Sequence, residues 1–309
     1  MELWQLGVGD IATLVTGGQV SPVEVVRALL RRIESLEPDV RAWAALDPEG
    51  ALADAERIAA GRTLAPIYRG EGVKQPGLLA GVPVGIKDIF WTKGLRTAAG
   101  SRVLADFVPR EDATTVKRLR RADAVILGKL HTAEFAGADP PPTRNAWNPE
   151  HTPGGSSSGS AVAVATGMVP AALGTQTGGS VLRPAAYNGV VGLKPSYGLV
   201  SCFGVIPAAW SFDTVGIFAR SVQDAALVLD VLAGYDKKDP ATARRPRVRY
   251  SRDALDSTPP RLGVVRDYFW ERCDAEVKRE IEEVTGRLSR AGATLEEVRL
   301  PACFSRIHA

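Results

Sequence analysis

Residues 79–88 have the sequence LAGVPVGIKD, in which an apolar run ends in a lysine and an aspartate. The run from residue 81 to residue 86 is typical of a short buried strand. A lysine at the end of such a strand is unusual in a protein core unless it is paired or neutral. The common alternative is a buried apolar stem with an ammonium group that reaches solvent. Lys87 is therefore a candidate catalytic residue that needs support from other parts of the chain.

Helical patterns dominate the chain before this stretch. The motif SPVE at residues 21–24 provides a serine N-cap, a proline in the first turn and a glutamate that completes a capping box. Apolar residues follow at helical spacing, and we expect Pro38 to end this helix. A second helix is predicted over residues 48–60. We therefore expect residues 1–65 to form a helical N-terminal segment.

Strands and helices alternate after residue 79. The predicted elements are helices over residues 112–122, 158–166 and 221–233, and strands over residues 124–127 and 171–173. The stretch 140–155 is rich in proline and asparagine and is expected to be a loop. This alternation predicts an α/β fold, and we place its catalytic core in residues 79–235.

The last part of the chain has a different character. Residues 236–261 are polar and basic, which is typical of a solvated surface loop, although the arginines could also suit an acidic partner. Residues 262–309 begin with a strand, continue with an amphipathic helix and return with a strand at 294–298. This βαβ unit needs a sheet to join. We expect residues 1–309 to form one domain.

Composition excludes several classes of function. The 309 residues carry 38 Lys and Arg against 35 Asp and Glu, a net charge of +3, so neither nucleic acid nor membrane is expected as a partner. The three cysteines are far apart and fit no disulfide framework. No apolar run approaches the length of about 18 residues that a membrane helix needs, and the N-terminus does not resemble a signal peptide. We therefore expect a cytoplasmic protein.

Histidine is rare, with only three in the chain, so mechanisms that depend on imidazole have few candidates. The HExxH motif is absent, no His/Cys cluster has the spacing of metal ligands, and we expect neither a metal nor another cofactor. If this chain is an enzyme, we expect acid–base chemistry without histidine.

Residues 154–160 read GGSSSGS and allow three interpretations. The glycine spacing is that of a phosphate-binding loop, but Ser160 stands where that loop requires lysine. A flexible linker is the second interpretation, yet apolar segments follow at once. The third is a backbone held in unusual torsions, which glycine permits. The GxSxG string within it does not follow a strand, so it lacks the context of a nucleophile elbow.

Residues 177–180, TGGS, follow the strand predicted at 171–173. A serine after two glycines has an approachable backbone, and successive N–H groups there could converge on one oxygen as an oxyanion hole does. A tight turn before Pro184 explains the same residues equally well.

Taken together, these stretches resemble the amidase signature family of serine hydrolases. The resemblance covers nearly the whole chain and is carried by motifs at residues 79–88, 153–160, 174–198, 213–216 and 219–221, in this order. It implies the amidase signature fold, in which helices cover a mixed central sheet. It also implies an amidohydrolase that cleaves a carboxamide C–N bond.

The resemblance implies a Ser–Ser–Lys triad made of Lys87, Ser156 and Ser180. Ser180 would be the nucleophile, and Ser156, which would follow a cis peptide bond, would pass its proton to Lys87. Such a lysine must be neutral, and burial can lower a lysine pKa by up to about 3–5 units. Backbone N–H groups of Thr177, Gly178, Gly179 and Ser180 would hold the oxyanion.

Two positions depart from many family members, which have Asp where this chain has Gln176 and Arg where it has Leu182. Here the arginine is Arg183, and the string TQTGGSVLRPA resembles the subgroup that contains malonamidase and related small-acid amidases. In that subgroup the arginine is implicated in holding a substrate carboxylate, a task that suits its planar fork. The alternative is a structural arginine on local carbonyls. Gly155 is the second residue expected at the substrate.

Family members usually continue well beyond the point that matches residues 300–301, so we expect the C-terminal part of the fold to be missing here. The leading interpretation is a free-standing amidase that acts on a small amide, and a homodimer is compatible with it. One alternative is the amidase subunit of a tRNA-dependent amidotransferase, which requires a partner subunit; Gln176 and the shifted arginine argue against it. The other alternative is an inactive scaffold.

Overall fold

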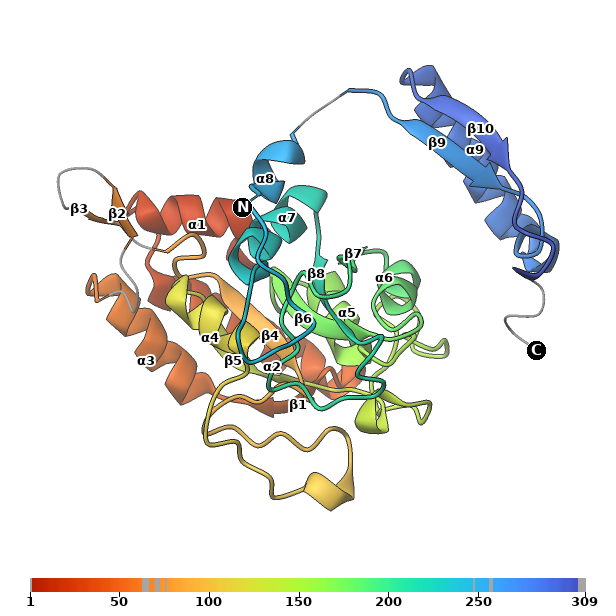
Figure 1. Ribbon diagram of the computed structural model, residues 1–309. Helices are drawn as coiled ribbons and strands as arrows, with labels where there is room; N and C mark the ends of the chain where they lie inside the picture. The colour runs from red at the N-terminus through yellow and green to blue at the C-terminus, as the bar shows by residue number, and fades with distance from the viewer. Residues whose placement is uncertain are drawn as a thin grey trace. The chain divides into compact units, whose positions relative to one another are not determined.

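The computed structural model describes residues 2–62, 77–246, 248–255 and 258–304, together with the backbone alone of residues 67–69 and 73–75. The chain divides into two compact units, residues 1–254 and residues 255–309, which are drawn in Figure 1.

A six-stranded mixed sheet forms the centre of the first unit, with the strand order β1-β5-β4-β6-β8-β7. Its middle strand β4 is parallel to both neighbours, whereas β1 joins β5, β8 joins β6 and β7 joins β8 in antiparallel pairs. The mixed sheet expected from the family resemblance is therefore confirmed. The strands are β1 (Trp43–Leu46), β4 (Pro83–Lys87), β5 (Val125–Leu130), β6 (Ala171–Gln176), β7 (Val191–Leu193) and β8 (Thr214–Ala219).

Helices pack against this sheet. α5 contacts β4, β5, β6 and β8, and every residue from Ser158 to Val164 in it is buried. α4 packs on β5, α7 packs on β8 and β7, and α4 and α7 also contact each other. The helices are α1 (Val8–Thr16), α2 (Pro22–Val40), α3 (Pro48–Ala59), α4 (Thr114–Arg121), α5 (Ser158–Ala165), α6 (Leu182–Asn188), α7 (Val222–Leu232) and α8 (Tyr250–Asp253).

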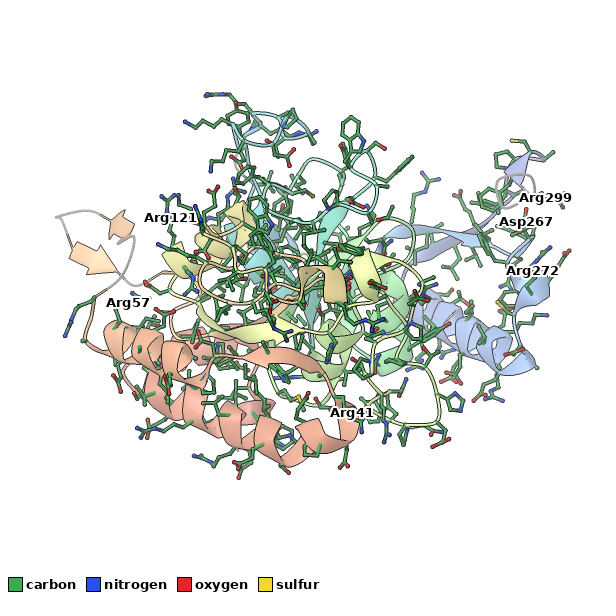
Figure 2. All side chains as sticks on the ribbon, turned by 90° about the horizontal axis from the view of Figure 1, so that it is seen from below. Arg41, Arg57, Arg121, Asp267, Arg272 and Arg299 are labelled. Atoms are coloured by element: carbon green, nitrogen blue, oxygen red, sulfur yellow. The ribbon has the colours of Figure 1, made fainter. Side chains whose placement is uncertain are left out.

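Helix α2 begins as the sequence predicts but ends later. Ser21 and Glu24 form the reciprocal capping box, yet the helix continues through Pro38 to Val40, so the expectation that Pro38 ends it is wrong. A proline in the last turn removes only one backbone donor, and the helix tolerates this loss. The chain instead leaves the helix at Arg41 (labelled in Figure 2), which adopts a left-handed conformation with φ 51° and donates its N–H to Glu37.

Two segments contain elements that the sequence did not predict. Residues 1–65, expected to be helical, also include the edge strand β1. Residues 236–261, expected to be loop, include the short helix α8, whose Tyr250 N–H and Ser251 hydroxyl bond the Asp230 carboxylate on α7. A small hairpin of β2 (Ile67–Arg69) and β3 (Val73–Gln75) precedes β4.

The second unit has the predicted βαβ order. β9 (Arg261–Val265) and β10 (Thr294–Val298) are parallel neighbours, joined by α9 (Ala275–Arg290). The apolar residues that mark this helix in the sequence remain 37–45% exposed, and they are Val277, Ile281, Val284 and Leu288. Across the described ranges, no helix is both long enough and apolar enough to cross a membrane.

Candidate active site

Lys87 is the last residue of β4, a strand in which all five residues are buried. Its side chain is fully enclosed, and its Nζ lies 2.9 Å from the Ser156 Oγ and 2.9 Å from the Thr175 Oγ1. The parallel register that pairs Ile86 with Leu173 brings the ends of β4 and β6 to the same edge of the sheet. The structure therefore places the lysine in contact with the first serine of the glycine–serine stretch, a pair that the family resemblance implies.

Burial changes the charge that Lys87 can carry. Removal of water from the ammonium group lowers the pKa of Lys87 from 10.5 to about 7, and the carboxylate of Asp213 partly opposes this effect. A substantial fraction of this lysine is therefore neutral near pH 7, and a neutral amine can accept a proton. The alternative considered from sequence, an ammonium group that reaches solvent, does not apply because the side chain has no exposed surface.

The four serines at positions 156–160 have separate partners. Ser156 contacts Lys87, whereas the hydroxyls of Ser157, Ser158 and Ser160 donate to the backbone carbonyls of Thr175, Gly154 and Leu173, respectively. The peptide bond between Gly155 and Ser156 is cis, as the family resemblance implies. Ser157, the central residue of the GxSxG string, is buried and bonded, which agrees with the absence of a nucleophile elbow.

Ser180 lies in the loop that follows β6. It is half-buried, and within the described part of the chain its hydroxyl has no hydrogen-bond partner, so the structure does not join it to Ser156 by a hydrogen bond. The backbone N–H groups of Gly178, Gly179 and Ser180 likewise have no acceptor among the described residues. Thr177 and Gly178 are exposed. These donors are therefore available to an oxygen atom of a ligand.

Gln176 holds the far end of this loop. Its Oε1 accepts hydrogen bonds from the N–H groups of Val181 and Leu182, both at 2.9 Å. The residue that the sequence marked only as a departure from the family thus closes the turn that presents Ser180.

Arg183 is exposed and lies beside Gly155. Its Nε and Nη2 both donate to the Gly155 carbonyl, at 3.2 and 2.8 Å. Both residues line a pocket of about 320 Å³ together with Gly154 and Tyr187. The guanidinium therefore braces the backbone before Ser156, while its remaining nitrogen, Nη1, has no hydrogen-bond partner within the described ranges. This geometry suits the structural role and leaves one donor for a ligand.

Sequence reasoning missed three polar residues at or near the site. Thr175 is the second hydrogen-bond partner of Lys87, and Asp213 holds Thr177. Lys129 on β5 is fully buried, donates to the Phe90 carbonyl at 2.6 Å and to the Thr97 hydroxyl at 2.7 Å, and lies 3.5 Å from Asp88. The available signal for Lys129 was the same as for Lys87, a lysine inside an apolar run.

The Lys129–Asp88 pair fixes the turn that follows Lys87. Burial lowers the pKa of Lys129 to about 8 against the opposing effect of Asp88, and burial raises the pKa of Asp88. Because Asp88 also accepts from the Ala98 N–H, the pair ties the end of β4 to the segment around residue 98. Within the described residues, no three His, Cys, Asp or Glu side chains are grouped to hold a metal ion.

Comparison with known proteins shows the family of the chain. The sequence profile of the family described as Amidase matches residues 24–308. One subunit of the glutamyl-tRNA(Gln) amidotransferase of Carboxydothermus hydrogenoformans is 42% identical over 308 residues, which cover 97% of this chain and 62% of that protein. The corresponding protein of Geobacter sp. strain M21 is 43% identical, with coverage of 97% and 62%.

Solved structures give the same result. The native peptide amidase from Stenotrophomonas maltophilia has a TM-score of 0.85 and 38% identity, over 98% of this chain and 64% of that one. The equivalent glutamyl-tRNA(Gln) amidotransferase subunit from Thermotoga maritima has a TM-score of 0.81 and 32% identity, with coverage of 97% and 63%. The chain thus spans less than two thirds of the length of these relatives. With a profile that matches most of its residues, the chain belongs to the amidase family, and its fold is the amidase signature fold.

Proposed function

We propose that this chain hydrolyses a carboxamide through an acyl-enzyme on Ser180, with Ser156 and Lys87 as the proton relay. The observation that carries the proposal is the enclosed Lys87, whose pKa of about 7 and 2.9 Å contact with Ser156 suit a general base. The amidase relatives support the same reaction class.

In the proposed reaction, the Ser180 hydroxyl attacks the amide carbon while its proton passes to Ser156, and the Ser156 proton passes to neutral Lys87. The negative charge that develops on the carbonyl oxygen is stabilised by the free N–H groups of the 178–180 segment. The relay then returns the proton to the leaving nitrogen, and the C–N bond breaks. Water attacks the ester by the same route and releases the carboxylic acid and free Ser180.

A fluorophosphonate probe tests the nucleophile. We expect the probe to label the parent protein and the Ser196→Ala variant equally, because Ser196 is an exposed serine outside the relay. The Ser180→Ala variant should not be labelled. Undiminished labelling of Ser180→Ala would reject the assignment, and a parent protein that is never labelled would support the inactive scaffold.

Two different observations support two candidate roles for this amidase. The spare Nη1 of Arg183 beside the 320 Å³ pocket supports a small amide that bears a carboxylate, as sequence reasoning proposed. The matched relatives that are subunits of glutamyl-tRNA(Gln) amidotransferases support the second candidate, an amidase subunit that acts with a partner protein. Homodimer formation stays a prediction.

Ammonia release separates these candidates. A free-standing amidase should release ammonia from a small acidic amide without any other macromolecule. An amidotransferase subunit should release little ammonia by itself and more when its partner protein and a charged tRNA are added.

A further inference from the structure

Asp213 is the residue immediately before β8, the strand that pairs with β6. The antiparallel register pairs Gln176 with Thr214, so the residues just beyond this pair, Thr177 and Asp213, face each other where the two strands separate. The side chain of Asp213 is buried with 7% exposure, and Thr177 donates its hydroxyl to the Asp213 Oδ1. A buried carboxylate thus connects the two loops that leave this edge of the sheet.

The second carboxylate oxygen of Asp213 also accepts hydrogen bonds. Its Oδ2 accepts the N–H of Ala208 at 2.8 Å and the N–H of Ala209 at 3.0 Å. The N–H of Asp213 in turn donates to the Ala209 carbonyl at 2.9 Å. One side chain therefore closes the 208–213 turn on itself and fastens it to Thr177, the first residue of the loop that carries Ser180.

We propose that Asp213 is a positioning residue of the amidase reaction, which anchors Thr177 and with it the oxyanion loop to the 208–213 turn. The inference rests on the proposed function, since it assigns the loop its role in holding the oxyanion. Without this anchor, the remaining hydrogen bonds of the loop among the described residues are those of Gln176 with Val181 and Leu182 and that of the Gly179 carbonyl with the Arg183 N–H, all on the C-terminal side of Thr177. Asp213 and Gln176 thus secure the loop at its two ends.

The charge of Asp213 gives this role a signature that packing alone does not have. The carboxylate raises the pKa of Lys87 against the larger lowering by burial. Asp88, which follows Lys87 in the chain, lies 3.5 Å from Lys129, and the two compensate each other. Cys202 contacts the Asp213 carbonyl, and burial raises the pKa of its thiol to about 12. Asp213 is the one charged group of the described chain that visibly shifts the lysine.

Three variants separate the anchor from the charge. Asp213→Asn removes the charge, so the pKa of Lys87 should fall and the acidic limb of kcat/KM against pH should move to lower pH. Thr177→Val removes the anchor but keeps the charge, so kcat should fall about 10- to 100-fold while the acidic limb stays in place. Thr177→Ser should restore most of the activity because it keeps the hydroxyl.

Asp239→Asn is the matched control. Asp239 is also a buried carboxylate that accepts backbone N–H groups, from Cys202 at 2.7 Å and Ala241 at 2.9 Å, and it lines the same 440 Å³ pocket as Asp213. It has no contact with Thr177 and does not shift the pKa of Lys87. We expect Asp239→Asn to lower the melting temperature without moving the acidic limb.

The outcomes decide between the roles. If Thr177→Val retains full kcat, Asp213 does not position the loop and the inference is rejected. If Asp213→Asn loses activity and melting temperature with an unmoved acidic limb, Asp213 is structural in the same way as Asp239. Failure of the proposed function is seen separately, as a parent protein without amide hydrolysis. In that case the backbone N–H resonances of Gly178, Gly179 and Ser180 replace the rate, and resonances that are unchanged between the parent and Thr177→Val overturn the inference.

Discussion

Replacing Lys87 by methionine should remove activity and, at the same time, remove a pH-dependent destabilisation of the fold. The pKa of Lys87 drops from 10.5 in the unfolded chain to about 7 in the folded one. Between these two values the unfolded state binds more protons, so the free energy of unfolding of the parent rises with pH across this window. At pH 6 the full difference between the two pKa values opposes folding by on the order of 5 kcal/mol.

The variant lacks this titration but leaves the hydroxyls of Ser156 and Thr175 without their lysine partner, at about 1–3 kcal/mol each. The test is therefore how the difference in unfolding free energy between the parent and Lys87→Met changes with pH, and not its sign at one pH. From pH 6 to pH 9 the parent should gain about 3 kcal/mol relative to Lys87→Met.

Urea unfolding at several pH values measures this change. Five of the six tryptophans, all except Trp270, lie in residues 1–254, so tryptophan fluorescence follows the unit that contains Lys87. A difference in unfolding free energy that is constant from pH 6 to pH 9 would refute the argument, because Lys87 would then carry the same charge in both states. The methionine variant of the compensated Lys129 serves as a comparison with a smaller pKa shift.

Three further predictions concern catalysis. Lys87→Arg should be inactive, since arginine stays protonated and cannot accept the proton of Ser156. A stopped ammonia assay at pH 9 checks this. Arg183→Ala should lower kcat/KM for acidic amides by roughly one to two decades and leave neutral amides nearly unchanged; an equal fall for both classes, with a lower melting temperature, would assign the arginine to bracing Gly155 alone. Gln176→Ala should lower both kcat and stability, the latter by about 1–3 kcal/mol, because two N–H groups lose their acceptor, whereas Gln176→Glu keeps an acceptor oxygen and should retain more of both.

The local elements of the fold could be predicted where one short motif specifies them. The SPVE motif marks the start of α2 because its capping groups lie within four residues. The apolar run before Lys87 marks β4 for a similar reason. The pairing of strands could not be predicted in this way. β1 is a four-residue edge strand whose partner β5 lies about 80 residues later, and no local sequence pattern specifies which distant strand it joins.

The site shows the same division. Lys87 and Ser156 were predicted through the family resemblance, and their contact was found. Asp213 and Lys129 were given no role. A carboxylate before a strand is a common feature of surfaces, and Lys129, although it lies inside an apolar run as Lys87 does, belongs to none of the motifs that carry the resemblance. Their importance arises only when the sheet places Asp213 opposite Thr177 and encloses Lys129 beside Asp88.

In a deep mutational scan, the serines at positions 156–160 would divide into two phenotypes, with Ser156 separated from the other three. Ser157 and Ser160 donate to carbonyls of the neighbouring strand β6, so their alanine variants should lose cellular abundance. Among the described residues Ser156 donates to no carbonyl and contacts Lys87 instead, so its alanine variant should accumulate normally and lose turnover. Adjacent positions that carry the same amino acid would thus be under different selection, one for the abundance of the protein in the cell and the other for its catalytic activity.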